Sequence, residues 1–158
     1  MKYLFLVAAV ASLFFIACDS KGVDACTPRE PAAEDTAFVR YNALHGYAAT
    51  KLPSGMYYQI VDPGTGAVPT ATSNVRVNYE GRRIKDDSTF DKNTSLSGLA
   101  TNLSSVISGW TTGVPLIKSG GTIRLMIPSK FGYGCIGSGT SIPPNTPLFF
   151  EIKLLAVY

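Results

Sequence analysis

Hydrophobic and polar residues alternate along much of the second half of the chain, as they do in β-strands with one buried face. In "VRVNYEG" (75–81) the two valines and the tyrosine share one side, and the polar residues share the other. "LFFEIKLLAVY" (148–158) has the same period of two, and "GMYYQIVDPGTG" (55–66) is a shorter strand that ends at a Pro-Gly turn. These segments predict an antiparallel sheet.

The segment "TIRLMI" (122–127) repeats the alternation and predicts a further strand of this sheet. Its core-facing side consists of Ile123, Leu125 and Ile127. Its opposite side, which the half-buried pattern places away from the core, consists of Thr122, Arg124 and Met126.

The residues before the first strand have the spacing of a helix. Thr36 is a candidate N-cap and Gly46 a candidate stop. One side of the helix carries Phe38, Tyr41 and His45. We therefore predict one short amphipathic helix within residues 36–51. His45 is the only histidine of the chain, and because no motif places a Ser, Cys or acidic partner beside it, we interpret it as a residue of the helix surface.

A second helical pattern interrupts the strands at "SGWTTGVPLIK" (108–118). One helical face carries Trp110, Gly113, Val114 and Ile117. Ser108 is a candidate cap, and Pro115 removes a backbone donor and so limits the helix to about two turns. Because a sheet must cover its apolar face, the pattern predicts several antiparallel strands with one short helix laid across them.

The N-terminus has the character of an export signal. Lys2 precedes an uncharged run from Tyr3 to Ala17 that is apolar except at Ser12, and this run is shorter than the ~20 residues of a bilayer span. The run ends in "FIAC", which resembles a bacterial lipobox. Residues 1–17 are therefore predicted to be a lipoprotein signal peptide, with Cys18 as the lipidated residue that anchors the protein to a membrane of the cell envelope. The alternative is an ordinary signal peptide or an uncleaved anchor, with Cys18 incidental.

Residues 18–35 are predicted to be a flexible tether, because "DSKGVDACTPREPAAED" is polar, lacks periodicity and contains two prolines. The globular domain is expected to span residues 52–158. Lipidation of Cys18 leaves Cys26 in the tether and Cys135 in a late loop. An exported protein can keep a disulfide, but free thiols are favoured over a Cys26–Cys135 bridge, and the cysteines have no metal-site spacing.

Composition excludes several classes of function. The chain has 158 residues, a formal net charge of +3 and 16% charged residues, and its basic residues form no cluster longer than a pair. Nucleic-acid binding therefore has no electrostatic support. Among the side chains there is no Ser, His or Cys arrangement for covalent catalysis, and no cofactor or metal is implied.

Six short motifs follow one another across roughly Leu52 to Tyr158: "VNYEG", "STFDKN", "VISGW", "FGYG", "IPPN" and "PLFFEIKLL". In this order and spacing they resemble the motifs of FKBP-type peptidyl-prolyl cis-trans isomerases. The resemblance implies an α+β fold in which a twisted antiparallel sheet of about five strands wraps around one short α-helix. The "LPSGMYYQI" entry and the lipobox look like lipid-anchored members from Bacteroidetes-type bacteria. The implied partners are proline-containing polypeptides and macrolide immunophilin ligands.

The resemblance also assigns roles to individual residues. Trp110 is expected to be the platform under a proline ring. Asp91 is expected beside the substrate carbonyl, and the Tyr133 hydroxyl and the Ile107 N–H are expected to donate to the substrate. Ile142 is expected in the flap over the pocket. The apolar walls are expected to be Tyr79, Phe90, Val106, Ile107 and Phe150.

Two features depart from the family pattern. Thr101 stands where the family usually has a phenylalanine a few residues before "VISGW", with Leu103 as the neighbouring aliphatic, so that one wall is expected to be smaller and more polar. The flap segment "CIGSGTS" (135–141) consists mostly of small residues and contains Cys135. Both departures bear on the rate and sequence preference of the isomerase.

These residues suit rotation about an Xaa-Pro bond. Amide resonance sets its barrier at ~18–20 kcal/mol, and a catalyst need only favour the twisted, less polar amide, which an apolar pocket does. The sequence thus predicts an envelope-tethered isomerase without covalent catalysis. The alternatives are a module of the same fold that binds proline segments with little or no turnover, or a chaperone.

Overall fold

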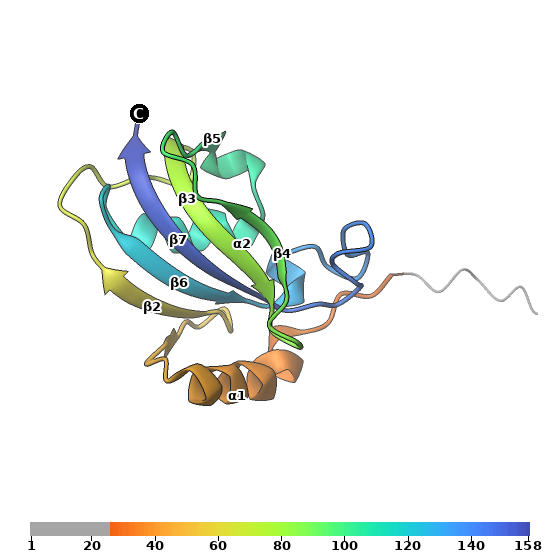
Figure 1. Ribbon diagram of the computed structural model, residues 1–158. Helices are drawn as coiled ribbons and strands as arrows, with labels where there is room; N and C mark the ends of the chain where they lie inside the picture. Colours follow the sequence, from red (N-terminus) through yellow and green to blue (C-terminus); the bar gives the residue numbers. More distant parts are fainter. Residues whose placement is uncertain (1–25) are drawn as a thin grey trace, which may run out of the picture.

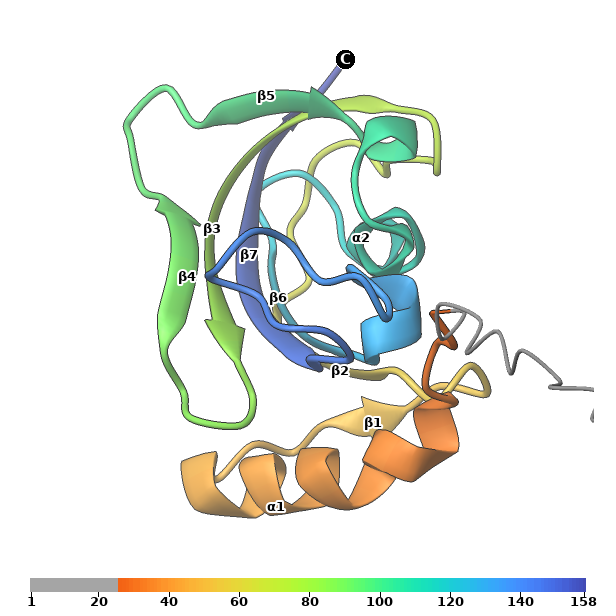
Figure 2. The ribbon, with the colours of Figure 1, turned by 90° about the vertical axis from the view of Figure 1, so that its right-hand side faces the viewer.

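Antiparallel strands form one sheet that curves around a short helix (Figures 1 and 2). A computed structural model describes residues 26–158. The order of neighbouring strands is β1-β2-β6-β7-β3-β4, and β5 also pairs with β3. The strands are β1 (Thr50–Lys51), β2 (Tyr57–Asp62), β3 (Asn74–Arg83), β4 (Thr89–Asn93), β5 (Leu99–Asn102), β6 (Thr122–Ile127) and β7 (Leu148–Val157). The predicted α+β architecture is confirmed, with seven strands in place of about five.

The inner face of the sheet packs against helix α2 (Ser108–Gly113) and the 3₁₀ turn η3 (Val114–Leu116) that continues it. A Cβ atom at Gly109 would lie 2.5 Å from Ile127, and one at Gly113 would lie 2.5 Å from Leu125. These two glycines therefore let the helix backbone approach β6 directly. Ser108 begins the helix but does not cap it, and its hydroxyl instead donates to the Phe131 carbonyl.

The main core lies between α2 and the sheet. The alternation read from the sequence is correct here, because the inward residues of three strands are buried, apart from the half-buried Tyr79. This core contains Val75, Val77, Ile123, Leu125, Ile127, Leu148, Phe150, Ile152 and Leu154 from the sheet, and Trp110, Val114 and Ile117 from the helical segment.

The opposite face of the sheet is covered by helix α1 (Asp35–His45), which lies outside the curve of the strands (Figure 2). Phe38 and Tyr41 pack there in a second core with Tyr57, Ile84, Met126 and Phe149. Met126 is only 1% exposed, so the expectation that its side of β6 faces away from any core is wrong. A single strand has buried residues on both sides because each side meets a different helix.

The predicted N-terminal helix is confirmed, although it begins differently. The 3₁₀ turn η1 (Pro31–Glu34) runs directly into α1, so Thr36 lies inside the helix and does not cap it. Gly46 ends the helix with a φ of 64°, as expected. His45 is half-buried, stacks on Tyr47 and lies 3.8 Å from Asp87, so it belongs to the helix surface but has aromatic and acidic neighbours.

Residues 26–35 were expected to be part of a flexible tether, and the structure corrects this. Glu34 is 2% exposed and accepts hydrogen bonds from both the N–H and the hydroxyl of Ser129. Glu30 forms an ion pair with Lys130. The segment therefore packs on the domain through contacts to residues about a hundred positions away in sequence. The predicted signal peptide, the lipidated Cys18 and residues 18–25 lie outside the described residues.

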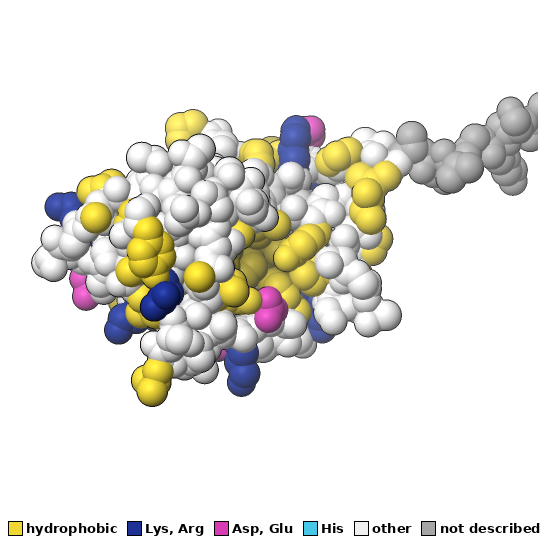
Figure 3. Space-filling model, turned by 90° about the horizontal axis from the view of Figure 1, so that it is seen from above, with side chains coloured by type: hydrophobic (Ala, Val, Ile, Leu, Met, Phe, Trp, Pro, Cys, Tyr) yellow, Lys and Arg dark blue, Asp and Glu magenta, His cyan; other side chains and the backbone are white. Residues whose placement is uncertain are grey.

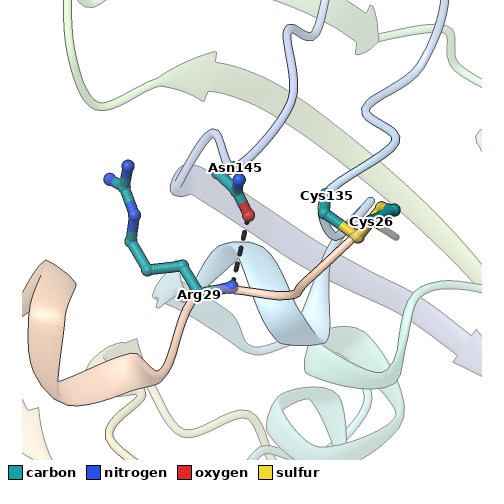
Figure 4. Close-up of a disulfide and its surroundings, with 4 residues drawn as sticks. All are labelled: Cys26, Arg29, Cys135 and Asn145. Carbon is teal, nitrogen blue, oxygen red and sulfur yellow. Dashed lines mark hydrogen bonds between the residues drawn. A yellow bond between two sulfur atoms is a disulfide. The ribbon is translucent and has the colours of Figure 1, made fainter. Parts of the chain in front are cut away.

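A disulfide joins Cys26 to Cys135, where free thiols were favoured (Figure 4). The Cα atoms of the two cysteines are 5.5 Å apart, a separation at which a bridge forms without backbone movement. The bond spans 109 residues of sequence. Its pairing depends on the packing of the N-terminal segment, which local sequence does not encode.

The second core predicts a specific stability effect. Phe38→Ala should lower the free energy of unfolding by about 3–5 kcal/mol, because it leaves a cavity between α1 and the outer face of the sheet. Urea denaturation of the purified protein measures this loss. The matched control is Val39→Ala at the neighbouring position, whose side chain is 54% exposed, and it should stay within about 0.5 kcal/mol of the parent. Equal losses in the two variants would contradict the packing.

Candidate functional site

A cavity of about 260 Å³ opens between the sheet, the start of α2 and the loop after β6. The space-filling view shows a hollow of this kind, with hydrophobic side chains gathered in it and an acidic side chain at its edge (Figure 3). The cavity is lined by Tyr79, Phe90, Asp91, Leu99, Ser105, Val106, Ile107, Trp110, Tyr133 and Phe150.

Aromatic rings held edge to face build the apolar part of this cavity. Trp110 lies with its ring centroid 5.1 Å from Tyr79 and 5.2 Å from Phe150, at interplanar angles of 78° and 88°. Phe90 meets Phe150 at 5.5 Å and 88°. Such T-shaped contacts are favourable for aromatic pairs. Trp110 is 4% exposed, so it is at once part of the main core and a wall of the cavity.

Gly81 on β3 makes this ring arrangement sterically feasible. A Cβ atom there would lie 2.6 Å from Phe150 and 2.7 Å from Phe90. Both rings therefore pack directly over the strand backbone, and any larger residue at this position would push them into the cavity. The sequence contains this glycine within the "VNYEG" motif, but the alternation of hydrophobic residues does not reveal its role.

Two phenols and one carboxylate form the polar edge of the cavity. The Tyr79 hydroxyl donates a hydrogen bond of 2.6 Å to Asp91. Burial, then this hydrogen bond and the negative charge of Asp91, raise the pKa of Tyr79 far above its ordinary value. Burial and the charge of Asp91 also raise the pKa of Tyr133. Both phenols therefore stay protonated at neutral pH, with the Tyr79 hydroxyl engaged by Asp91.

Two donors at the edge carry no hydrogen bond within residues 26–158. The Tyr133 side chain is 37% exposed, and its hydroxyl has no acceptor in this part of the chain. The Ile107 backbone N–H precedes the first turn of α2 and is likewise free there, while the Ile107 carbonyl accepts from Trp110 N–H. A guest in the cavity can thus meet donors on two sides.

The structure brings together all but one of the pocket residues expected from sequence. Ile142 is the exception, because it is 4% exposed, belongs to the main core and does not line the cavity. A backbone pair between Ser138 and Ile142 closes the tip of the loop. The lining residues that sequence reasoning missed are Leu99 and Ser105.

The structure also corrects the expectation that Thr101 forms part of the cavity wall. Leu99 lies opposite Val77 and lines the cavity, while Thr101 lies opposite Val75, two residue pairs farther along β3, and does not line it. Leu103, expected to supply the neighbouring aliphatic, is fully buried in the main core. The wall next to the aromatic rings is therefore aliphatic, and Thr101 does not make the cavity more polar.

The lining of this site is mostly apolar. Its polar side chains are the Asp91 carboxylate, the Tyr79 and Tyr133 phenols and the Ser105 hydroxyl. Within residues 26–158, no cluster of three or more His, Cys, Asp or Glu side chains could hold a metal ion. An apolar cage with a few directed donors suits a small rigid ring attached to a polar carbonyl. The fold and the site are therefore suited to hold a compact apolar ring beside an amide.

Comparisons with known proteins agree with this conclusion. The model of the family described as FKBP-type peptidyl-prolyl cis-trans isomerase matches residues 66–155. The chain belongs to this family. A probable FKBP-type peptidyl-prolyl cis-trans isomerase FkpA from Neisseria meningitidis is 42% identical over 122 residues, which cover 77% of this chain and 44% of the relative.

Two further similarities extend the comparison. The outer membrane protein MIP of Legionella longbeachae is 40% identical over 107 residues, which cover 67% of this chain and 46% of the relative. A crystal structure of a peptidyl-prolyl cis-trans isomerase from Pseudomonas syringae has a TM-score of 0.69 and 40% identity, and the match covers 81% of this chain and 92% of that one. The chain therefore spans less than half the length of these two curated relatives but nearly all of the solved bacterial domain.

The Tyr79–Asp91 pair predicts an alkaline titration. The folded protein keeps the Tyr79 proton at pH values where an unfolded tyrosine loses it, so the pair contributes stability that is complete below pH ~10 and declines as the pH rises above it. Asp91→Asn should lower the pKa of Tyr79 because it removes the carboxylate charge but keeps an acceptor. Tyrosinate absorbance measured against pH would show Tyr79 titrating earlier than in the parent, and Tyr133 as well, because the charge of Asp91 also raises the pKa of that phenol.

The matched control for this titration is Asp62→Asn. The Asp62 carboxylate accepts from the backbone N–H of Gly64, on a turn after β2. This variant should leave the tyrosinate titration curve unchanged. A curve that is the same in Asp91→Asn and the parent would show that the charge of Asp91 does not act on Tyr79.

Proposed function

We propose that this protein is a peptidyl-prolyl cis-trans isomerase that binds Xaa-Pro segments in the cavity above Trp110. The observation that carries the proposal is the aromatic cage, in which Trp110 meets Tyr79 at 78° and Phe150 at 88° beside a space of about 260 Å³. Membership of the isomerase family supports it. The proposed substrates are proline-containing polypeptides, and macrolide immunophilin ligands would compete for the same cage.

The chemistry follows from the polarity of the cavity. A planar amide carries resonance charge on its oxygen and nitrogen, and a twisted amide carries less. Apolar walls therefore disfavour the planar form relative to the transition state, which lowers the barrier without a covalent intermediate. An acceleration of ~10⁴-fold requires about 5.5 kcal/mol of differential stabilisation.

The proposed roles follow the positions of the lining groups. Trp110 supports the proline ring, and the walls on either side are Tyr79, Phe90, Val106, Ile107 and Phe150. The Tyr133 hydroxyl and the Ile107 N–H donate to carbonyl groups of the bound segment. Asp91 lies beside the rotating carbonyl and is held there by the Tyr79 hydroxyl at 2.6 Å.

An isomerase assay on Xaa-Pro peptides tests the function directly. The purified protein should accelerate cis-trans interconversion well above the uncatalysed rate. Trp110→Leu should weaken peptide binding roughly tenfold or more, because it removes the platform under the ring. If the protein binds proline peptides but does not accelerate their isomerisation above the uncatalysed rate, it is a binding module and not an isomerase.

Phe38→Leu is the matched control for the tryptophan variant. It trims a buried aromatic residue of the second core, on the opposite face of the sheet. It should lower stability but leave the peptide affinity of the folded protein unchanged. If both variants weaken binding equally after correction for the folded fraction, Trp110 acts through stability alone.

We also propose that the protein is an exported lipoprotein of the cell envelope, anchored through Cys18 after removal of residues 1–17. The lipobox-like ending of the N-terminal apolar run supports this, and so does a Cys26–Cys135 disulfide, which persists in oxidising compartments. Within residues 26–158, no helix is long and apolar enough to cross a membrane.

Substitution of the predicted lipidated cysteine tests the anchor. Cys18→Ser in the full chain should move the protein from the membrane fraction to the soluble fraction, because it removes the only thiol in the lipobox-like motif. Fractionation followed by detection of the protein measures this shift. Full retention in the membrane fraction would contradict lipidation at Cys18, and Cys26→Ser is the control that should stay membrane-bound.

A further inference from the structure

We propose that residues 26–34 act as a strap that positions the Tyr133 wall of the cavity, with Glu34 and the Cys26–Cys135 disulfide as its two fixed points. The inference rests on the proposed function, because the cavity is the site of that function. It assigns a substrate-positioning role to a segment that lies outside the cavity and touches no guest. The wall in question is the loop of residues 129–145, called the cavity loop below.

The first fixed point is a buried carboxylate. Glu34 is 2% exposed and Ser129 is fully buried. The two Glu34 carboxylate oxygens accept from the Ser129 N–H at 2.8 Å and from its hydroxyl at 2.6 Å. The Ser129 carbonyl in turn accepts from the N–H groups of Gly132 and Gly134, which flank Tyr133. Glu34 thus holds Ser129 in place. The Ser129 carbonyl in turn closes the turn that contains Tyr133.

The second fixed point lies on the other side of Tyr133. Cys135 is two residues farther along the loop and is covalently joined to Cys26. Beside it, the Arg29 N–H donates to the Asn145 side chain at 3.2 Å (Figure 4). Asn145 also donates its own N–H to the Gly134 carbonyl at 2.9 Å. Strap contacts therefore reach the loop both at its middle and at its end.

The cavity loop needs such external contacts because its own backbone is permissive. Gly134, Gly137 and Gly139 all have positive φ angles, and glycine loses more conformational freedom on ordering than any other residue. The loop closes on itself at its tip through the Ser138–Ile142 pair, and nearer its base only through single backbone hydrogen bonds such as that from Asn145 to Gly134. Tyr133 is the one cavity-lining residue that this loop carries, so its position depends on how the base of the loop is held.

The consequence is a change in substrate binding. A loop released from the strap samples positions in which the Tyr133 hydroxyl is away from the cavity. Apparent affinity falls in proportion to the population of the competent position, while molecules in that position still react normally. Loss of the strap should therefore raise KM by roughly threefold or more and leave kcat within about a factor of two.

The glutamate is tested with two variants that differ only in hydrogen bonding. Glu34→Gln keeps both contacts, because its amide oxygen can accept from the Ser129 N–H and its amide N–H can donate to the Ser129 hydroxyl. Glu34→Leu has a similar size and keeps neither. KM for an Xaa-Pro peptide should rise in Glu34→Leu and stay near the parent value in Glu34→Gln.

The disulfide is tested by reduction and by substitution. Dithiothreitol-treated parent protein and the double variant Cys26→Ser with Cys135→Ser should show the same rise in KM, and dithiothreitol should have no effect on the double variant. Phe38→Leu controls for lost stability, since it weakens the second core far from the loop. An unchanged KM in both the reduced protein and Glu34→Leu would overturn the proposal.

Nuclear magnetic resonance separates failure of the strap from failure of the proposed function. Reduction should shift the amide signals of residues 132–136 and broaden them, while the β4 signals of Phe90 and Asp91 stay in place. These signals report on the loop whether or not the protein catalyses isomerisation. If the loop signals are unchanged and catalysis is normal, the strap proposal is wrong and the proposed function stands. If the loop signals change but the protein does not catalyse isomerisation, the proposed function is wrong and the strap proposal stands.

Discussion

The close approach of α2 to the inner face of β6 is the constraint on which the rest of the structure depends. At Gly109 and Gly113 the helix has no side chains between its backbone and the sheet, and Ile127 and Leu125 fill that space. The helix therefore lies deep inside the curve of the strands. Because Trp110 is on the first turn of this helix, the same approach places its ring beside Phe150 and at the bottom of the cavity.

This arrangement explains why the cavity is made largely of core residues. Trp110 and Phe150 are almost fully buried, and both also line the cavity. An enzyme that acts by holding an apolar ring can use its hydrophobic core directly as a binding surface, whereas one that needs a nucleophile must bring polar groups into contact with substrate. The few polar groups here lie at the edge, on Asp91, Tyr79 and Tyr133, where solvent offsets part of their desolvation.

Local patterns in the sequence predict most of this architecture, and long-range contacts account for what they miss. The alternation of hydrophobic and polar residues identifies the inward faces of β3, β6 and β7, because successive side chains of a strand point to opposite faces. Alternation alone does not show that Met126 is buried, since α1 covers it from elsewhere in the chain. The register between β5 and β3 also decides which residue of β5 lines the cavity. Leu99 and Thr101 lie on the same face of β5, and only the pairing with β3 places Leu99 in the cavity.

The N-terminal segment is the clearest case of a structure that composition misrepresents. Polar residues and prolines before α1 are typical of a linker, and residues 26–34 bury only one side chain fully, that of Glu34. A small number of directional contacts tie them to the loop after β6. A buried carboxylate would be costly without partners, and Ser129 satisfies both of its oxygens. Such a segment is ordered by specific pairing and not by hydrophobic burial, so its order can be lost locally while both hydrophobic cores remain intact.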